Sequence, residues 1–577
     1  MSLDSNLPED WKKLLNPSQI QAIETINGPV LIMAGAGSGK TRVLTHRYAH
    51  LVKHHNVDVE QILAITFTNK AAEEMKSRIS KLLNLKISPK WISTFHSLCV
   101  KILRIHGDKI GYQRNFTIYD QLDTNKVVRL CMSENSIDTK QYSPKNFRAQ
   151  ISNLKNSMTT PGEAIENAEN FYDVKVAEVY SSYEKKLMMA NALDFDDLLV
   201  KTVELLETNE SILKFWSNKF QFIMVDEYQD TNLVQYKLVE LLGSNNKNVC
   251  VVGDSDQSIY AFRGADIRNI LEFEKDFEDT SIVRLEQNYR STSNILRAAN
   301  AVIERNSDRL GKTLWTDAGE GEPVALYAAF NEHDEARYIV ECIKQWVGDG
   351  SRREDAAILY RSNAQSRVLE SALLRAEIPY RIYGGQRFYE RMEIKNALSY
   401  LRLVSNSDDD MAFERVVNLP ARGIGEKTQG IIREIARRQS CTLWIASSQA
   451  ISDNELSSRA SSALTMFLKL ITSMTNEVKE LPLIEKTETI IQRSGLMDLY
   501  KREKGEKGMA RVENLEELVS ACGNFEPEDP NLSPLAQFLD QVALDAGDRQ
   551  ADIDEDAVQL IERDDDGTEI VAADRTA

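Results

Sequence analysis

The sequence lacks the features of membrane and secreted proteins. Its 577 residues contain no apolar run that approaches the roughly 20 residues of a membrane-spanning helix, and the N-terminal MSLDSNLPEDWKK is too polar for a signal peptide. The six cysteines lie far apart, and no two of them have the spacing of a metal site or a CxxC motif. We therefore expect a cytoplasmic protein with reduced thiols and no membrane contact.

Positive charge is also scarce. The 70 Lys and Arg residues face 88 Asp and Glu residues, which gives a net charge of −18. Such a chain does not coat nucleic acid through its overall charge, although a local basic groove is compatible with it. The hydrophobic fraction of 42% is ordinary for a globular protein, and the length allows about three to five domains.

The most informative stretch is PVLIMAGAGSGKTRVL, residues 29–44. Residues 30–33 are apolar and read as a buried parallel strand, and a helical pattern follows the glycines. Glycines let backbone N–H groups turn toward phosphate oxygens, and the start of the helix adds the positive end of its dipole. Lys40 can place a charge between the outer phosphates, and the Thr41 hydroxyl can hold Mg²⁺. The alternative is a glycine-rich turn with a chance lysine, but strand, loop and helix together favour a phosphate-binding loop.

A second stretch, FIMVDEYQDT at residues 222–231, supplies carboxylates. Its apolar strand ends in the adjacent acids Asp226 and Glu227. In an ATPase the first acid would hold Mg²⁺, and the second would polarise the attacking water. Such a pair is also common as a helix cap, but its occurrence with a phosphate loop in one chain favours the catalytic interpretation.

Other strand ends carry polar and aromatic residues that suit a nucleotide or a single nucleic-acid strand. Gln257 follows an apolar strand and could sense a γ-phosphate. Tyr289 could stack on adenine, and Arg290 could act as an arginine finger. Phe67 could stack on a base. Taken singly, Phe67 also reads as a core residue, His96 as structural and Arg290 as an ion-paired surface residue.

A series of segments resembles, in this order, the motifs of UvrD/PcrA/Rep-type DNA helicases of superfamily 1. They are LNPSQIQAI, AGAGSGKT, ITFTNKAA, STFHSL, VDEYQDTN, VVGDSDQSIYAFRGA and QNYRS. The likeness continues through residues 357–367 and 380–385 and extends to about Leu560. Because order and spacing match as well as content, the resemblance is highly specific.

The resemblance implies an α/β fold with two RecA-like P-loop domains, each built on a parallel sheet and carrying a mainly helical insertion. The expected domains are 1–110 with 196–280 (1A), 111–195 (1B), 281–378 with 551–577 (2A) and 379–550 (2B). It also implies ATP-driven 3′→5′ movement on single-stranded DNA with duplex unwinding, in DNA repair or replication. The implied ligands and partners are ATP, Mg²⁺, single-stranded DNA, single/double-strand junctions and DNA repair proteins. The resemblance further implies a monomer or weak dimer in a bacterial-type cytosol, associated with the nucleoid.

The matching motifs imply roles for individual residues. The catalytic residues would be Lys40, Glu227 as the base, Gln257 and Arg290. The nucleotide would be bound by Gln19, Gly35, Ala36, Gly37, Ser38, Gly39, Lys40, Thr41, Arg42, Tyr289 and Arg290. Mg²⁺ would be held by Thr41 and Asp226. DNA would be contacted by Phe67, Asn69, His96, Phe195, Tyr260, Phe262, Arg263, Arg361, Gly423, Gly425 and Thr428.

Two of these implied DNA contacts need comment. Phe262 stands where the family usually has Trp. The Phe ring offers a smaller stacking face than a Trp ring. Gly423, Gly425 and Thr428 belong to ARGIGEKT, which resembles the family's Gly-Ile-Gly turn. A tight glycine turn before a helix can present backbone N–H groups to duplex phosphates.

The resemblance stops near Leu560. The family's next motif is a Thr/His-rich strand followed by Ala-Lys-Gly-Leu-Glu-Phe, and its last motif carries a second arginine finger; neither is found in the sequence. We therefore expect domain 2A to be incomplete, with an open sheet edge. Such a finger contributes about 10³-fold or more to the rate, so the expectation is nucleotide binding with weakened hydrolysis.

Two other functional classes stay open at this point. The chain could be an ATP- and DNA-binding protein without motor activity. It could also be a subunit of a helicase–nuclease, although no carboxylate-rich nuclease segment follows the helicase motifs. A G-protein or a kinase would explain neither DEYQD followed by GDSDQSIY nor the repeated aromatics at strand ends.

Overall fold

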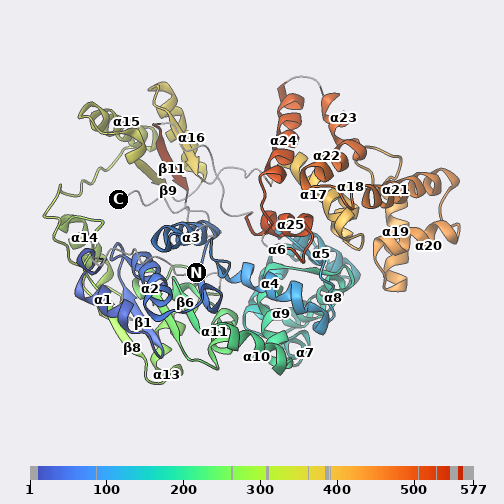
Figure 1. Cartoon of the computed structure of the whole chain (residues 1–577). Coiled ribbons are helices and arrows are strands. Elements are labelled where there is room, and N and C mark those ends of the chain that lie inside the picture. The colour runs from blue at the N-terminus through green and yellow to red at the C-terminus, as the bar shows by residue number, and fades with distance from the viewer. Residues whose placement is uncertain are drawn as a thin grey trace. The chain divides into compact units, whose positions relative to one another are not determined.

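The computed structural model describes residues 11–85, 88–261, 264–306, 311–360, 363–383, 389, 391–503, 506–527, 529–545 and 556–562. The chain forms two compact units, whose elements are labelled in Figure 1. The units are Met1–Arg290 with Asn306–Trp315 and Met392–Leu544, and Ser291–Arg305 with Thr316–Arg391 and Asp545–Ala577. Across the described ranges, no helix combines the length and apolarity needed to cross a bilayer.

The first unit is built on a six-stranded parallel sheet with the strand order β3-β2-β6-β7-β1-β8. Its strands are β1 (Val30–Ala34), β2 (Ile62–Thr66), β3 (Ile92–Thr94), β6 (Phe222–Val225), β7 (Val249–Gly253) and β8 (Ser281–Leu285). All residues of β1, β2 and β7 are buried, as parallel strands covered on both faces require. The buried strands that the apolar runs predicted are therefore confirmed.

Helices cover both faces of this sheet. They are α1 (Pro17–Glu24), α2 (Lys40–His55), α3 (Asn69–Leu83), α4 (Phe95–His106), α9 (Phe195–Thr208), α10 (Glu210–Lys219), α11 (Leu233–Gly243), α12 (Arg268–Leu271) and α13 (Phe273–Asp276). Ile32 and Ala64 pack with α2 and α3, whereas Met33 and Ile65 pack with α4, α9 and α11. Successive side chains point to opposite faces of a strand, so each strand contributes to both cores. The loops that follow β1, β6 and β7 are thereby held along one edge of the sheet.

A mainly helical segment is inserted between α4 and α9, as predicted. It contains α5 (Gln121–Glu134), α6 (Pro144–Asn156), α7 (Pro161–Glu166) and α8 (Phe171–Met189), which share one apolar core. Its ends meet in a short parallel pair, β4 (Thr117–Ile118) with β5 (Ala192–Leu193). The sequence did not predict this pair, because two-residue strands are too short to show a periodic pattern.

A second helical segment also belongs to the first unit. It consists of α17 (Met392–Ser405), α18 (Asp410–Val416), α19 (Glu426–Gln439), α20 (Leu443–Ser452), α21 (Ser458–Glu477), α22 (Leu483–Ser494), α23 (Leu496–Lys501), α24 (Glu506–Gly523) and α25 (Pro534–Asp545). It is joined to the first insertion by polar contacts. Arg402 forms an ion pair with Asp123 at 2.7 Å, and the Asn406 amide donates to Thr117 Oγ1 at 3.1 Å.

The second unit contains a smaller parallel sheet with the order β10-β11-β9. Its elements are α14 (Ser293–Ile303), α15 (Glu332–Gly348), β9 (Ala357–Tyr360), α16 (Asn363–Arg375), β10 (Tyr380–Tyr383) and β11 (Val558–Glu562). Val340 on α15 and Leu373 on α16 pack with Leu560 of the central strand. The chain is thus an α/β protein with two parallel sheets and many helices.

Two of the expected domain boundaries need correction. We expected residues 281–378 in the second RecA-like domain, but β8 pairs with β1 in the first sheet. Its Val283 and Leu285 complete the core beneath α2, which explains why the strand stays with that sheet. We also expected 379–550 in the second insertion, but β10 pairs with β11 in the second sheet. The insertion therefore begins at α17.

Candidate nucleotide site and single-strand track

The glycine-rich loop between β1 and α2 is tightly enclosed. Gly37 and Gly39 have φ values of +65° and +88°, which favour glycine. A Cβ atom on Gly37 would lie 2.6 Å from Asn288 Nδ2, and one on Gly39 would lie 2.8 Å from Gln19 Nε2. Gly39 is also the N-cap of α2 and offers no side-chain acceptor. The amides of the first helical turn are therefore left for an anion, as predicted for a phosphate loop.

Two side chains from distant segments fix the backbone of this loop. Asn288 Nδ2 donates to the Ala36 carbonyl at 2.6 Å. Gln19 Nε2 donates to the Ser38 carbonyl at 2.9 Å, and Ser38 Oγ donates to the Gly35 carbonyl at 2.7 Å. The predicted nucleotide-binding residues Gln19, Gly35, Ala36 and Ser38 thus lie together, and hydrogen bonds from other segments hold their loop.

A lysine and two acids form the charged centre of the site. Lys40 Nζ lies 3.1 Å from Glu227 Oε2. Burial and the charge of Glu227 raise the pKa of Asp226 to about 7, although Lys40 opposes this shift. Burial alone would lower the pKa of Lys40, but Glu227, Asp226 and Asp254 outweigh it and raise that pKa. Carboxylates thus outnumber the lysine, and a divalent cation beside Asp226 fits this charge balance.

The backbone at the acid pair is unusual. Glu227 has φ +49°, in the left-handed region that non-glycine residues rarely adopt. Its N–H donates to Asp226 Oδ1 at 3.0 Å. Residues held in this conformation cluster at functional sites.

A chain of hydrogen bonds joins Glu227 to the loop after β7. Gln229 Nε2 donates to Glu227 Oε2 at 3.0 Å, and Gln229 Oε1 accepts from the Asp254 N–H at 2.9 Å. Asp254 Oδ2 in turn accepts from Gln257 Nε2 at 2.6 Å. Lys312 forms an ion pair with Asp254 and is itself buried. Gln257 is therefore connected to the predicted catalytic acid through two intermediate residues, Asp254 and Gln229.

A polar corner lies beside the phosphate loop. Asn16 and Gln19 form a capping box at the start of α1. The Asn16 amide also donates to Gln287 Oε1 at 3.2 Å and to Tyr289 Oη at 2.9 Å. The Tyr289 N–H donates to the Gly37 carbonyl at 2.9 Å, while 48% of this residue's surface stays exposed. Tyr289, whose ring is predicted to stack on adenine, is thus held at its backbone and at its hydroxyl, and part of its surface stays exposed.

The remaining nucleotide-site residues lie around the same loop. Arg290 is exposed, and its Cβ would be 2.8 Å from a Cβ placed on Gly37. Its N–H donates to Asn288 Oδ1 at 2.9 Å. Thr41 is half-buried and Arg42 is exposed in the first turn of α2. The fold therefore brings all the predicted nucleotide-site residues to one edge of the sheet.

Two aromatic pairs lie at the ends of β2, β3 and β7. The rings of Phe67 and Tyr260 are 5.3 Å apart, and those of His96 and Phe195 are 5.5 Å apart. Tyr260 is only 5% exposed, so it backs the half-buried Phe67 instead of presenting a free face. Burial lowers the pKa of His96 to about 4. A neutral imidazole at pH 7 can contact a base but gives no charge to a phosphate.

The other predicted DNA contacts are scattered. Asn69, the first residue of α3, donates to the Leu544 carbonyl at 3.3 Å. Three of the predicted residues, Phe262, Arg263 and Arg361, lie outside the described residues.

The glycine turn before α19 is exposed and firmly anchored. Gly423 has φ +83°, Gly425 is the N-cap of α19, and a Cβ on either would meet no atom within 4 Å. Arg422 holds the turn from inside, donating to Tyr400 Oη at 2.7 Å and to the Ser494 carbonyl at 2.9 Å. Thr428, in the first turn of the helix, is half-buried. The turn predicted to bind phosphates is thus an exposed helix start whose backbone is held by Arg422.

Sequence reasoning missed several residues that shape the site. Asn288 stands inside the QNYRS motif, and Gln229 stands inside DEYQD, so their motifs offered a signal. Lys312 had none, because it comes from an unremarkable segment that only the fold brings to Asp254. Asn16 stands inside LNPSQIQAI, and its amide reaches Tyr289.

Comparison with known proteins finds two helicase domain models that match consecutive parts of the chain. The UvrD/REP helicase N-terminal domain matches residues 15–278, and the UvrD-like helicase C-terminal domain matches residues 283–562. DNA helicase II of Escherichia coli (strain K12) is 47% identical over 549 residues, which cover 95% of this chain and 76% of that protein. ATP-dependent DNA helicase PcrA of Staphylococcus aureus (strain Mu50) is 46% identical over 542 residues, which cover 94% of this chain and 73% of that protein.

Proposed function

The chain belongs to the UvrD/REP helicase family, and on this premise we propose that it is an ATP-dependent DNA helicase. It would move 3′→5′ along single-stranded DNA and separate duplex strands. One observation carries the proposal. Lys40 of the phosphate loop lies 3.1 Å from Glu227, which is hydrogen-bonded through Gln229 and Asp254 to Gln257. Hydrolytic and phosphate-sensing groups are thus connected in one network, as a nucleotide-driven motor needs.

The residues of the site divide the chemistry between them. Bound Mg²⁺–ATP would supply a phosphoryl group that is transferred to water. The amides of the phosphate loop and the Lys40 ammonium would bind the phosphates, while Asp226 and Thr41 would hold the metal. Glu227 would accept a proton from the attacking water at its carboxylate, which Gln229 orients at 3.0 Å.

Other side chains would make hydrolysis depend on the state of the site. Gln257 would sense the terminal phosphate, and the exposed Arg290 would act as an arginine finger. Tyr289 would stack on adenine, with Gln19 fixing the loop beside it. These roles rest on the family likeness together with the position of each residue around one loop.

We assign the six-stranded sheet and its helices to domain 1A, and the inserted helices from α5 to α8 to domain 1B. The β10-β11-β9 sheet would belong to domain 2A, and α17 to α25 to domain 2B. Phe67 and Phe195 would stack on bases of the single strand. The exposed turn at Gly423 and Gly425 would bind duplex phosphates at a single/double-strand junction.

The cellular setting follows from the same proposal. The chain would act in DNA repair or replication, in the cytoplasm and at the nucleoid of a bacterium, as a monomer or weak dimer. DNA repair proteins would be its partners. The two relatives described above are DNA helicases of bacteria, which supports this setting.

A second candidate is an ATP- and DNA-binding protein with little or no motor activity. It would keep the nucleotide and DNA contacts proposed above but would not couple them to rapid hydrolysis. The matched regions span 76% and 73% of the two relatives. The described part of the second unit holds three strands.

Steady-state ATP hydrolysis with and without single-stranded DNA separates the two candidates. Lys40→Ala serves as the control without phosphate binding. Strong stimulation by DNA that disappears in the control, with faster unwinding of a 3′-tailed than a 5′-tailed duplex, supports the helicase. ATP and DNA binding without turnover supports the second candidate.

A further inference from the structure

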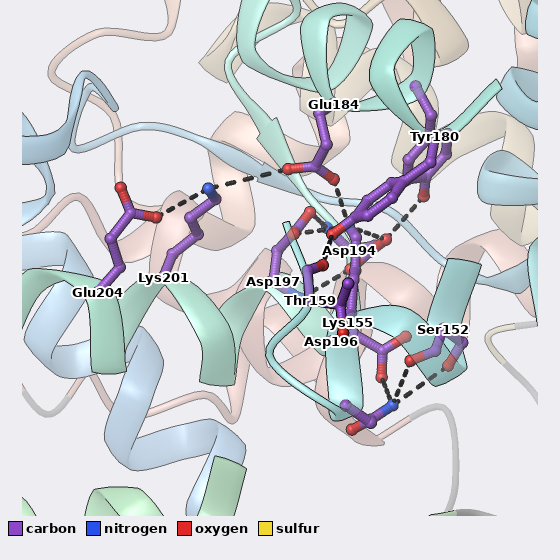
Figure 2. A network of polar contacts seen from close by, with 12 residues as sticks. Ser152, Lys155, Thr159, Tyr180, Glu184, Asp194, Asp196, Asp197, Lys201 and Glu204 are labelled. Atoms are coloured by element: carbon purple, nitrogen blue, oxygen red, sulfur yellow. Dashed lines mark hydrogen bonds and ion pairs between the residues drawn. The ribbon is translucent and has the colours of Figure 1, made fainter. Parts of the chain in front are cut away.

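The last turn of α6 fixes the first insertion to the start of α9. Lys155 is fully buried, and its Nζ lies 2.8 Å from Asp194 Oδ2, 2.6 Å from Asp197 Oδ1 and 2.7 Å from Glu184 Oε1. Figure 2 shows these acids converging on the lysine from α8 and α9. Removing one partner from a buried ion cluster is strongly destabilising. Lys155 therefore fixes the position of its neighbour, Asn156.

Asn156 joins three segments that are far apart in the sequence. Its Nδ2 donates to Asp196 Oδ1 at 2.9 Å, and to the Ser152 carbonyl at 2.9 Å. Its Oδ1 accepts from Asn232 Nδ2 at 2.6 Å. On a third side it packs against Gly264, where a Cβ would lie 3.7 Å from Asn156 Cβ. An amide can donate and accept at the same time, which is why one side chain can hold both polar partners.

Two of these segments lead to the single-strand track. Asp196 directly follows Phe195, whose ring lies 5.5 Å from that of His96. Gly264 follows Tyr260 closely in the chain, and its N–H donates to the Ala261 carbonyl at 3.0 Å. Asn156 therefore contacts Asp196, which is adjacent to Phe195, and Gly264, which lies shortly after Tyr260 in the chain.

The third segment leads to the hydrolytic centre. Asn232 is the N-cap of α11 and closes the short segment that begins with Glu227. The same segment is tied to the turn beyond Gly264, because the Thr231 carbonyl accepts from the Asp266 N–H at 2.9 Å. A shift of the segment from Glu227 to Asn232 would therefore move the hydrogen-bond partner of Asn156.

We propose that Asn156 is a positioning residue that couples the nucleotide site to the single-strand track. This inference rests on the proposed function and deepens it. Asn156 touches neither ligand; it holds the segment after Glu227 in register with Phe195 and with Gly264. An ATP-dependent change in the first segment then reaches the other two through one amide.

The test measures coupling directly and needs no turnover. The dissociation constant for a fluorescent oligo-dT is measured by anisotropy with and without a non-hydrolysable ATP analogue. We expect the analogue to change the affinity of the unmodified chain by about 5-fold or more, a typical coupling between linked sites. In Asn156→Ala this ratio should fall toward one. The affinities for analogue alone and DNA alone should stay within about 2-fold, because Asn156 contacts neither.

The controls separate coupling from folding. Asn153→Ala removes an exposed residue of the same type from the same helix and should leave the ratio unchanged. The combination of Asn156→Asp with Asp196→Asn reverses donor and acceptor between the two side chains and should restore part of the coupling. Thermal unfolding of all variants is followed in parallel.

Each contrary outcome overturns a defined statement. A ratio in Asn156→Ala equal to that of the unmodified chain refutes the role of Asn156 and leaves the proposed function intact. Parallel losses of both single-ligand affinities and of thermal stability would make Asn156 merely structural and also refute its role. An unmodified chain that binds neither ligand refutes the proposed function itself.

Discussion

Asp226 should make the ligand-free protein less stable at neutral pH than an otherwise identical chain without this acid. Its pKa is raised to about 7 by burial and by Glu227, whereas an unfolded aspartate titrates at about 3.9. Between these values the folded chain keeps a proton that the unfolded chain has released. Stability therefore falls as pH rises from about 4 to about 7 and stays low above that.

The size of the effect follows from the shift. About three pKa units at about 1.36 kcal/mol each give a penalty of roughly 4 kcal/mol at pH 8. Asp226→Asn removes this titration while the amide oxygen can still accept from the Glu227 N–H. The substitution should therefore raise the free energy of unfolding by up to about 4 kcal/mol at pH 8, but by only about 1.5 kcal/mol at pH 5.

Urea unfolding in EDTA at several pH values between 5 and 8 measures this difference. Asp108→Asn, which replaces an exposed aspartate of the same unit, is the matched control. Adding MgCl₂ should narrow the gap at pH 8, because the cation favours the ionised carboxylate. Parallel stability curves for the unmodified chain and Asp226→Asn, or a less stable variant at pH 8, would refute the reasoning.

Three pairs of residue and measurement test the site further, two of them beside a comparison variant. Glu227→Gln should lower ATP turnover by about 10²-fold or more with nucleotide affinity nearly kept, since only proton acceptance is lost, whereas Lys40→Ala should lose binding as well; equilibrium binding beside turnover would expose the opposite pattern. Gly37→Ala should weaken nucleotide binding by about 10-fold or more, because its Cβ has no room, while Gly28→Ala shares a positive φ but has open space around it; equal affinities of these two variants would contradict the packing argument. Phe67→Ala should weaken oligo-dT binding by about 5-fold to 100-fold, as expected for loss of one base-stacking ring; anisotropy titration with no change would remove Phe67 from the track.

Local patterns were sufficient for the elements of the nucleotide site. The strand before Gly35, the glycine positions and the helix start at Lys40 all follow from short-range preferences for burial and for positive φ. The acids after β6 were found in the same way, because an apolar strand ending in two carboxylates is visible in ten residues. Motif order then connected these elements into one family resemblance.

The domain boundaries were less accessible. A strand such as β8 has the same alternating pattern whether it joins the first sheet or the second, so only its pairing with β1 assigned it. Tyr260 shows the same limit at a single residue. Its position in an aromatic-rich motif predicted a stacking face, but its burial against Phe67 depends on a loop from another strand.

The sequence by itself determined the family, the phosphate loop and the identity of the acids, because each is written in contiguous residues with local conformational preferences. Only the tertiary structure decided which polar groups complete the site. Asn288 on Ala36, Lys312 on Asp254 and Asn156 between Asp196 and Asn232 each join segments distant in the chain. Such contacts form only when the packing of the cores brings distant segments together. The sequence around a hydrogen-bonding side chain does not show which distant residue it will bond.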